Sequence, residues 1–329
     1  MTASDQFFEN KRILITGACG TIGRRILSVL LGNQNFNGEI IGLDNNESGL
    51  FSLQQRYIEE NRCRFFLADV RDRVKLSRKL EGVDIVFHTA AFKHVVLCER
   101  SPLEAVQTNI LGVQNVIDAA RETGVKTTIV TSSDKAVNPT SVMGTSKLMG
   151  ERIVTAANSS YSRNGSVFAS TRFGNVLGSS GSVVPLFHRQ IAAGGPVTLT
   201  DPEMTRFVMS IEQAVTLVVE SAAIARGGEV FITKMPVARI QDLAEIMIDT
   251  MAPLYGHEPN DVTIDIIGTQ PGEKLYEELM SQEEMRRAVE LPDYFSVLPA
   301  FRGIYRSIEY DYDEVLSEHV TNPYNSANE

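Results

Sequence analysis

The strongest constraint on the fold is a short apolar run that leads directly into a cluster of glycines. Residues 12–16 read RILIT, and residues 17–23, GACGTIG, follow without a break. Apolar residues at helical spacing come next, at Ile26 and Leu30. A strand, a glycine turn and a helix start form a cradle for a pyrophosphate, because glycine admits close backbone approach and the helix N-terminus presents unpaired N–H groups. A glycine turn without a ligand has the same pattern. The residues expected to hold such a ligand are Gly17, Gly20, Thr21, Ile22 and Gly23.

Three more apolar runs follow, and each leads into acidic or small residues. The first, residues 39–43, ends at Asp44. A carboxylate there bonds the adenosine ribose hydroxyls and repels a 2′-phosphate, which favours NAD over NADP. The second, residues 64–68, leads into a position suited to the adenine edge, and the third, residues 84–87, into small residues that let the backbone lie against a cofactor. Together the four units predict that the chain binds NAD. These units add Asp44, Asp69, Val70, Ala90 and Ala91 to the expected cofactor site.

The regular alternation of strands and helices predicts the fold class. Strand patterns at residues 125–131 and 167–171 continue it, as does a helix that runs from the capping-box sequence SPLE at Ser101 to Gly124. Such alternation is typical of an α/β protein with a Rossmann-type doubly wound parallel sheet, whose ligands bind at the carboxyl ends of the strands. We therefore expect residues 1–175 to form an NAD-binding Rossmann domain.

The second half of the chain has a less regular pattern. This predicts a smaller, mixed α/β substrate-binding lobe over residues 176–295, interleaved with the first domain. Within it we expect a loop at residues 201–207 and a loop that turns into a helix at residues 268–277. Residues 296–329 are interpreted as a C-terminal tail that covers the cleft or a neighbouring subunit, and the sequence does not decide between the two.

The charge and the cysteines exclude several classes of protein. A net charge of -10 argues against general nucleic-acid binding, which needs clustered Lys and Arg. Cys19, Cys63 and Cys98 lack the spacing of a metal site or a disulfide framework, which suits a reducing compartment. The apolar runs are far shorter than the ~18 residues of a membrane span. The first residues, MTASDQFFENKR, lack the apolar core of a signal peptide. The sequence therefore predicts a soluble cytoplasmic protein with no metal and no membrane span.

Residues 129–151 carry the groups that proton transfer needs. A strand pattern ends in Ser133, Asp134 and Lys135, and Lys147 follows on a predicted helix. Next to a bound dinucleotide, these groups indicate hydride transfer at a carbinol. Ser133 would hydrogen-bond the substrate hydroxyl, and Lys147 would hold the nicotinamide ribose. The alternative for Lys147 is a solvated helix position, but its place one turn beyond a glycine loop favours the functional interpretation.

Met143 occupies a position where an enzyme of this kind usually has Tyr. It lies four residues before Lys147, so both side chains share one helix face. A thioether does not carry a proton, so Met143 cannot replace the phenolic base. We expect that a water near Met143, or the Ser133 hydroxyl, accepts the proton of the substrate hydroxyl with help from Lys147.

Several longer motifs make a family resemblance specific. They are GACGTIG, HTAAFKHV, SSDKAVNP, MGTSK, RFGNVLGSSGSVVP, DPEMTRF and PGEKLYEEL, spread over residues 10–285. With them, the chain resembles an extended short-chain dehydrogenase/reductase of the UDP-N-acetylglucosamine 4,6-dehydratase family of bacterial polysaccharide biosynthesis. SDKAVNP, MTRF and PGEKLYEE are similar to the Met-for-Tyr branch of that family, here in its soluble short form. The resemblance implies a lyase with tightly bound NAD, a nucleotide-sugar substrate and assembly into a homo-oligomer.

The reaction that the resemblance implies is a redox-neutral dehydration. Hydride leaves sugar C4 for NAD, water is eliminated across C5 and C6, and hydride returns to C6, which gives a 4-keto-6-deoxy sugar. Carried over residue by residue, Asp134 is the general acid at the C6 oxygen, Lys135 is the base at C5, and Ser133 binds the C4 oxygen. A base must present a neutral amine, so we expect burial and the charge of Lys147 to lower the pKa of Lys135. Neighbouring residues on an extended strand point to opposite faces, so we expect no salt bridge between Asp134 and Lys135, although the turn after the strand could still bring both into the pocket.

Four residues outside this stretch are predicted to bind the substrate. Arg206 suits a bidentate contact with the diphosphate, and Asn175 is a polar residue just past a strand end. Lys93 follows the fourth strand, from where it would reach the sugar or a phosphate. Glu273, in the PGEKLYEE turn, is predicted to bind uridine or its ribose. Similar proteins often have Arg in place of Gln270, which leaves UDP or another nucleotide such as GDP open.

Two other functions share parts of this pattern. A nucleotide-sugar epimerase uses the same cofactor and the same C4 oxidation but needs no acid at C6, so Asp134 and Lys135 together argue against it. A non-catalytic NAD sensor or scaffold would need neither that pair nor Lys147. Retention or inversion at C5 and epimerisation at C3 stay open from the sequence.

Overall fold

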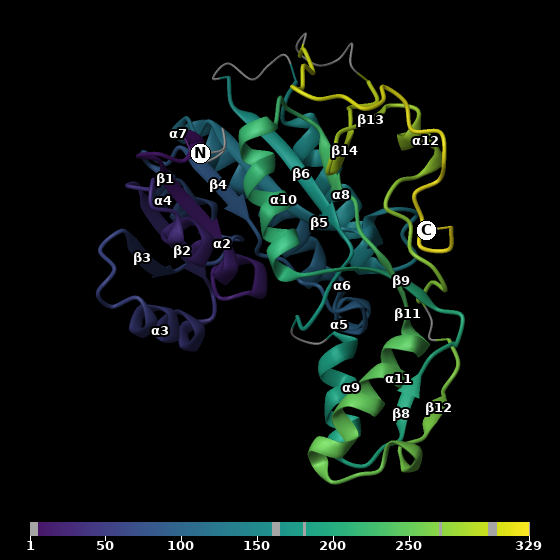
Figure 1. Ribbon diagram of the computed structural model, residues 1–329. Helices are drawn as coiled ribbons and strands as arrows, with labels where there is room; N and C mark the ends of the chain where they lie inside the picture. The colour runs from purple at the N-terminus through teal and green to yellow at the C-terminus, as the bar shows by residue number, and fades with distance from the viewer. Residues whose placement is uncertain (1–5, 160–164, 180–181, 270–271, 302–307, 329) are drawn as a thin grey trace.

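A sheet of nine strands forms the centre of the molecule (Figure 1). The computed structural model describes residues 6–159, 165–179, 182–269, 272–301 and 308–328. The strands of the sheet are β1 (Arg12–Thr16), β2 (Glu39–Asp44), β3 (Cys63–Leu67), β4 (Ile85–His88), β5 (Thr127–Ser133), β6 (Val167–Phe173), β10 (Val230–Thr233), β13 (Ala288–Glu290) and β14 (Tyr294–Val297). Their order is β13-β14-β10-β6-β5-β4-β1-β2-β3. All neighbours from β10 to β3 are parallel, and β14 and β13 add an antiparallel edge.

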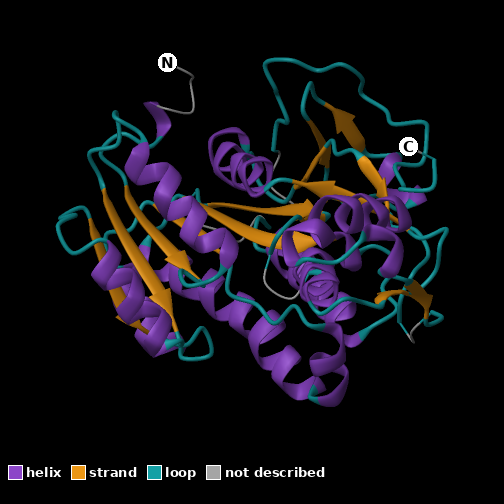
Figure 2. Ribbon diagram, turned by 60° about the horizontal axis from the view of Figure 1, so that its bottom comes forward, coloured by secondary structure: helices purple, strands orange, loops and turns teal. Residues whose placement is uncertain are grey.

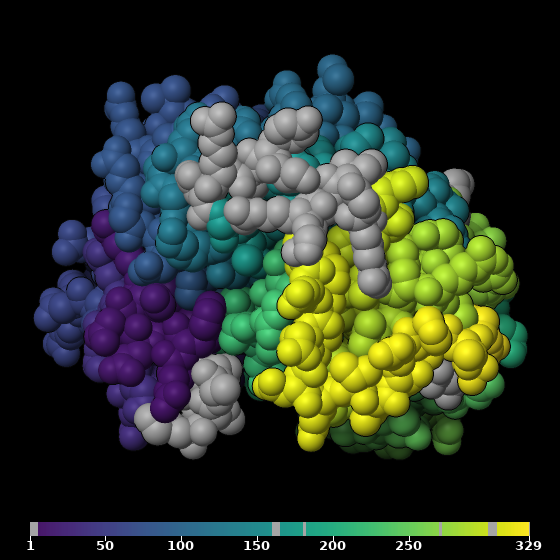
Figure 3. All heavy atoms as spheres, turned by 90° about the horizontal axis from the view of Figure 1, so that it is seen from above, coloured from purple at the N-terminus to yellow at the C-terminus, as the bar shows by residue number. Residues whose placement is uncertain are grey.

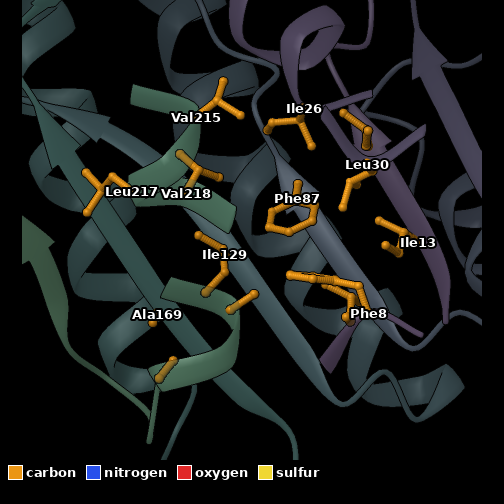
Figure 4. Packing of buried hydrophobic residues seen from close by; sticks show 14 of the residues in the cluster. Phe8, Ile13, Ile26, Leu30, Phe87, Ile129, Ala169, Val215, Leu217 and Val218 are labelled. Carbon is orange, nitrogen blue, oxygen red and sulfur yellow. The ribbon is translucent and has the colours of Figure 1, made fainter. Parts of the chain in front are cut away.

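Helices cover both faces of this sheet, as Figure 2 shows. They are α2 (Thr21–Gly32), α3 (Glu47–Arg56), α4 (Arg73–Leu80), α7 (Gly112–Thr123), α8 (Val142–Ala156) and α10 (Ile211–Ile224). Two short helices, α5 (Val95–Arg100) and α6 (Pro102–Ala105), pack against α8. Successive strand residues point to opposite faces. In β1, Ile13 and Ile15 therefore pack with α2 and α10, whereas Leu14 packs with α4, α7 and α8. Figure 4 shows Ile13 near Leu30 of α2, and Val215 of α10 on the same face. The predicted α/β fold with a doubly wound parallel sheet is confirmed, with β14 and β13 as an antiparallel addition at one edge.

The predicted helix from Ser101 to Gly124 is present, but its start and its middle differ from the expectation. Pro102 is the first residue of α6, and Gly124 ends α7 in the left-handed conformation with φ of 78°. A π-helical segment, η1 (Val106–Leu111), joins the two helices. The capping box is wrong, because the Ser101 side chain makes no capping hydrogen bond. Its backbone, at φ -135° and ψ 63°, is not in the extended conformation of a usual N-cap residue.

A smaller lobe lies beside the large sheet and appears at the bottom of Figure 1. Its apolar cluster joins two helices to a pair of parallel strands, with Phe187, Leu199 and Ile248 among its buried members. A three-stranded sheet, β11-β9-β7, leads from the large sheet into the lobe. The elements of this region are β7 (Asn175–Val176), α9 (Val183–Ala192), β8 (Val197–Leu199), β9 (Thr205–Met209), β11 (Val237–Arg239), α11 (Ile240–Met251), η3 (Ala252–Tyr255), η4 (Pro259–Asp261) and β12 (Ile264–Ile266).

Two local predictions in this half of the chain are wrong. Part of the expected loop at residues 201–207 is strand β9, because β11 and β7 lie on either side and supply hydrogen-bond partners. The loop that follows β12 does not turn into a helix by residue 277. Helix α12 (Gln282–Met285) begins only after the capping box formed by Ser281 and Glu284. Gln270, the predicted departure from similar proteins, lies outside the described residues.

The proposed domain limits stay a prediction. Strands β10 and β13 lie within residues 176–295 in sequence but belong to the large sheet, and β14 crosses position 296. Residues 308–328 lie along one face of the same chain, where Figure 3 shows them as part of the yellow surface. There the Tyr324 ring contacts the rings of Phe207 and Phe295. Within the part of the chain that the structure describes, no helix is long and apolar enough to cross a membrane.

Candidate active site

The carboxyl ends of the parallel strands surround a cavity of about 310 Å³. This volume is within the range of small-molecule sites. Thr21, Ile22 and Gly23 begin helix α2 and are not among the residues that line the cavity. Thr108 lines it from η1, although no sequence motif indicated this residue. The predicted cofactor residues that line the cavity are Gly17, Gly20, Asp44, Asp69, Val70, Ala90 and Ala91.

The glycine turn between β1 and α2 fits so closely that side chains are excluded. Gly17 has φ of +71°, and a Cβ atom there would lie 2.7 Å from the backbone nitrogen of Ala90. A Cβ atom on Gly23 would lie 2.3 Å from the carbonyl oxygen of Gly17. The backbone of the turn is therefore packed against the end of β4 and the start of α2. This leaves bare peptide groups at the cavity wall, which suits a pyrophosphate.

Two carboxylates are fixed at the rim of the same cavity. The Asp44 carboxylate accepts hydrogen bonds from the backbone N–H groups of Cys19 and Asn46, both at 2.9 Å. Asp69 forms an ion pair with Arg71 at 2.7 Å, and this hydrogen bonding lowers the pKa of Asp69 below its ordinary value. The cavity, its backbone cradle and an oriented carboxylate at the end of β2 together fit a dinucleotide.

The polar residues after β5 form a compact hydrogen-bonded cluster. Ser133 Oγ donates to Asp134 Oδ1 at 2.6 Å, and Lys135 Nζ lies 3.1 and 2.9 Å from the two oxygens of Asp134. The prediction that Asp134 and Lys135 form no salt bridge is therefore wrong. The two residues do not lie on an extended strand, because the chain turns into a 3-10 helix, η2 (Asp134–Ala136), directly after β5.

The pKa shifts in this cluster also differ from the expectation. Burial disfavours the ammonium of Lys135, but the carboxylates of Asp134 and Glu277 outweigh burial and raise the pKa of Lys135. Burial would likewise raise the pKa of Asp134, yet Lys135 and the Ser133 hydroxyl lower it. Lys135 keeps 37% of its side-chain surface exposed, so it is not sealed from the site. The predicted lowering of the Lys135 pKa by Lys147 is wrong, since carboxylates rather than a second ammonium surround it.

Lys147 and Met143 both belong to helix α8, but their side chains lie in different surroundings. Lys147 Nζ donates to the carbonyl oxygen of Thr131 at 3.0 Å, and burial lowers the pKa of Lys147 to about 8. The Met143 side chain is buried in an apolar cluster with Cys98 and Ala105. Met143 therefore packs against apolar side chains, and it lines neither the dinucleotide cavity nor the small cavity beside Lys147.

The small cavity beside Lys147, of about 10 Å³, has both polar and apolar lining residues. Asn109 and His88 line it, and His88 Nε2 has no hydrogen-bond partner among the described residues. The Asn109 amide donates to Ser146 Oγ at 2.9 Å and to the carbonyl oxygen of Phe92 at 3.0 Å. The space is about the size of one water molecule, and His88 Nε2 would be a hydrogen-bond partner for it. The predicted proton acceptor, a water near Met143 or the Ser133 hydroxyl, stays a prediction.

Two of the predicted substrate residues converge on a carboxylate that the sequence reasoning missed. Asn175 Nδ2 donates to both oxygens of Glu277, at 2.8 and 2.9 Å, and Arg206 Nε lies 3.3 Å from Glu277 Oε1. Lys135 Nζ lies 3.6 Å from the same oxygen. Burial, together with the charge of Asp134, raises the pKa of Glu277 to about 7. The PGEKLYEEL motif contains Glu277, but in sequence nothing distinguishes it from the other acids of the motif.

The backbone of Glu277 is held by a distant part of the chain. Ser326 Oγ accepts from the Glu277 backbone N–H at 2.8 Å, and the Ser326 backbone N–H donates to the Glu277 carbonyl oxygen at 2.8 Å. The same Ser326 hydroxyl lies 2.9 Å from Thr205 Oγ1, next to Arg206. Residues 205–206, Glu277 and Ser326 therefore form one connected unit.

The other two predicted substrate residues are exposed. Lys93 lies between β4 and α5, and Glu273 lies in the turn before Glu277. That turn reaches the loop before α8, where Thr140 Oγ1 donates to the Gly272 carbonyl oxygen at 3.0 Å. The roles of Lys93, Asn175, Arg206 and Glu273 in substrate binding stay predictions.

Comparison with known proteins decides the family. A family model described as polysaccharide biosynthesis protein matches residues 13–299. The chain belongs to this family. The match covers the large sheet, the smaller lobe and the whole cluster around Lys135, so family membership applies to the site as well as to the fold.

Similar members of the family carry different names. An uncharacterized membrane protein of Methanocaldococcus jannaschii is 50% identical over 89% of this chain and 87% of its own length. A UDP-N-acetylglucosamine 4,6-dehydratase (inverting) of Campylobacter jejuni is 40% identical over 90% of this chain and 85% of its own length. A UDP-glucose 4-epimerase of Rickettsia canadensis is 39% identical over 88% of this chain and 83% of its own length. The family thus includes proteins named as nucleotide-sugar dehydratases and epimerases.

A solved structure of a similar protein agrees with the fold. The X-ray structure of Pen from Bacillus thuringiensis matches with a TM-score of 0.89 and 41% identity, over 98% of this chain and 94% of that chain.

A buried ion network supports the site in this family member. Arg172, at the end of β6, is fully buried and donates to Glu151 at 3.0 and 2.5 Å and to Glu284 at 3.1 Å. It also donates to the Leu279 carbonyl oxygen at 2.7 Å. Glu151 lies one turn after Lys147 on α8, so the network ties that helix to β6 and α12.

Proposed function

We propose that the chain is an NAD-dependent nucleotide-sugar 4,6-dehydratase, which converts UDP-N-acetylglucosamine to a UDP-4-keto-6-deoxy sugar. The observation that carries the proposal is the hydrogen-bonded cluster of Ser133, Asp134 and Lys135 at the end of β5. A dehydration of this kind needs an acid and a base on one sugar, next to a site for a hydride carrier. The relative named UDP-N-acetylglucosamine 4,6-dehydratase, 40% identical, supports the choice of reaction and substrate.

The residues that would hold NAD are those of the cavity at the strand ends. The turn from Gly17 to Gly20 would take the pyrophosphate, Asp44 the adenosine ribose, and Lys147 the nicotinamide ribose. The chemistry that NAD supplies when bound is reversible hydride transfer, from C4 of the sugar and back to C6. Lys147 and the Ser133 hydroxyl would orient the C4 hydroxyl group.

Asp134 and Lys135 are poised to change protonation state together. In the structure the pair is ionic, whereas elimination needs a neutral amine at C5 and a protonated acid at C6. Transfer of one proton along the 2.9 Å hydrogen bond from Lys135 Nζ to Asp134 Oδ2 provides both. The amine then takes the C5 proton, and the Asp134 acid gives its proton to the departing C6 oxygen, which leaves as water.

The test is incubation with UDP-N-acetylglucosamine in D₂O, followed by NMR of the product. We expect a methyl group at C6, one solvent deuteron at C5 and no accumulation of NADH. The C5 coupling constants distinguish retention from inversion. Asp134→Asn and Lys135→Met should abolish the C6 methyl signal while leaving NAD bound. A product that keeps its C6 hydroxyl would contradict the proposal.

A nucleotide-sugar epimerase is the second candidate, because the relative named UDP-glucose 4-epimerase is similar at nearly the same identity. It predicts a C4 epimer that keeps its C6 hydroxyl and carries no deuterium at C5. Parallel incubation with UDP-glucose and with a GDP-hexose tests the remaining alternatives for the substrate.

Cytoplasmic location and assembly into a homo-oligomer stay predictions.

A further inference from the structure

Glu277 is the third charged group of the cluster formed by Asp134 and Lys135, and it comes from a different part of the chain. Its side chain is only 5% exposed. The charged groups that face it are Asp134 and Lys135 from η2 and Arg206 from β9. The polar groups are the Asn175 amide and the backbone N–H of Phe207, the latter at 3.1 Å.

We propose that the protonation state of Glu277 controls the Asp134–Lys135 pair, so that Glu277 is a positioning residue for the elimination step. The proposal deepens the proposed function and rests on it. Glu277 acts through Lys135 and Asp134, because its buried carboxyl group is covered by these residues, Asn175 and Arg206.

The physical reason lies in the position of Lys135 between two carboxyl groups. Its ammonium lies 2.9 Å from Asp134 Oδ2 and 3.6 Å from Glu277 Oε1. When both carboxyl groups are ionised, each favours the ammonium and opposes loss of its proton. When Glu277 carries a proton, only Asp134 favours the ammonium. Transfer of the Lys135 proton to Asp134, which breaks one N–H bond and forms one O–H bond, is then less unfavourable.

The arrangement of charges also explains how Glu277 can hold a proton. Two buried carboxyl groups beside one ammonium titrate as a coupled pair. The carboxyl group that accepts fewer strong hydrogen bonds is protonated more readily. Asp134 accepts from Ser133 and from Lys135 with both oxygens. Glu277 accepts short hydrogen bonds from the neutral Asn175 amide and a backbone N–H group, while its charged neighbours Arg206 and Lys135 lie farther away, at 3.3 and 3.6 Å. Burial raises the pKa of Glu277 to about 7, near the middle of the physiological range.

The experiment compares the pH dependence of turnover in the wild type, in Glu277→Gln and in Glu277→Asp. Gln mimics the protonated carboxyl group at every pH. If only the form with neutral Glu277 is active, wild-type turnover should fall about tenfold more than that of Glu277→Gln between pH 6 and pH 8, at tenfold per pH unit above a pKa near 7. Glu277→Asp should keep the decline. Incorporation of deuterium at C5 should show the same difference, because it reports the step of Lys135.

Glu278→Gln is the matched control. Glu278 is the next residue, is partly exposed, and pairs with Lys274 at 3.3 Å rather than with Lys135. It should keep the wild-type pH profile. NAD content and circular dichroism of each variant show whether it has folded. Equal pH profiles of folded Glu277→Gln and the wild type would overturn the proposal.

A second measurement separates this proposal from the proposed function. In NAD-loaded enzyme labelled with ¹⁵N-lysine, the Lys135 signal, assigned by its loss in Lys135→Met, should shift as the pH passes through 7. The shift should be absent in Glu277→Gln and present in Glu278→Gln. This result does not depend on which sugar is converted. If the Lys135 signal shifts with pH in Glu277→Gln as it does in the wild type, the control by Glu277 is refuted even when the dehydratase product forms. A wild type that makes another product refutes the dehydratase proposal alone.

Discussion

The buried network around Arg172 gives a prediction whose size follows from the structure. Arg172 has no exposed surface, and the side chains of Glu151 and Glu284 are only 4% and 5% exposed. Replacing Arg172 by Met keeps a long side chain of similar shape but removes every charged donor. Two carboxyl groups then remain buried, with their main partner lost.

The pKa of Glu284 indicates the magnitude. Burial alone would raise that pKa, but Arg172 first of all, with smaller contributions from the Ser281 backbone N–H and Arg287, lowers it from 4.5 to about 2. One pKa unit corresponds to about 1.4 kcal/mol, so the net shift of Glu284, in which Arg172 is the largest favourable cause, corresponds to about 3 kcal/mol. Removal of one partner from a buried ion pair typically costs about 3 to 5 kcal/mol. We expect Arg172→Met to lower the free energy of unfolding by about 3 to 5 kcal/mol at pH 7.

The pH dependence provides a second check. A carboxyl group with a lowered pKa in the folded state stabilises the protein fully above its unfolded pKa, and this contribution is lost as the pH falls through the folded pKa. For Glu284 the window runs from 4.5 down to about 2. The difference in stability between the wild type and Arg172→Met should therefore shrink below pH 4.5.

Urea unfolding of both proteins at pH 7 and at pH 4 measures this difference. Circular dichroism is the suitable signal because the chain has no Trp. Arg239→Met is the matched control: its ion pair with Asp242 is short, at 2.6 Å, but both side chains are nearly half exposed, at 45% and 49%. Such a pair contributes less than about 1 kcal/mol. A loss in Arg172→Met that is no larger than in Arg239→Met, or that grows at low pH, would refute the reasoning.

Two further predictions concern the cradle and the missing phenol. Gly17→Ala should weaken NAD binding, because its Cβ would lie 2.7 Å from the Ala90 nitrogen at a φ of +71°. The expected strain is about 1 to 3 kcal/mol, and titration calorimetry with NAD measures the loss of binding free energy. Gly32→Ala, with no atom within 4 Å of the new Cβ, should bind NAD like the wild type. Met143→Tyr should not raise turnover if a water or Ser133 accepts the C4 proton, and a strong rise governed by a single ionisation in the pH profile would contradict that route.

The sequence predicted the parallel part of the sheet because each strand carries its own signal. The runs that became β1, β2 and β4 are apolar, short and bounded by glycine, acidic or small residues, so their type is set locally. Strands β9 and β14 carry no such signal. They are strands because distant partners lie beside them: β11 and β7 for β9, and β10 for β14.

The same distinction applies to the site. Ser133, Asp134 and Lys135 were predictable as a group because one strand end delivers all three. The direction of the pKa shift of Lys135 was not predictable. It depends on the turn into η2 and on Glu277, which lies more than a hundred residues further along the chain. The surroundings of Met143 were equally hidden, because Cys98 and Ala105 approach it from other helices.

The hydrogen bonds between Glu277 and Ser326 have a consequence for the order in which the enzyme matures on the ribosome. Asp134 and Ser326 are 192 positions apart in the sequence. At the usual speed of translation, the ribosome needs roughly 10 to 40 s to cover that interval. The glycine cradle and Asp44 are made well before it begins. A nascent chain can therefore form its dinucleotide cradle first, and it completes the acid–base cluster only after residue 326 has left the exit tunnel.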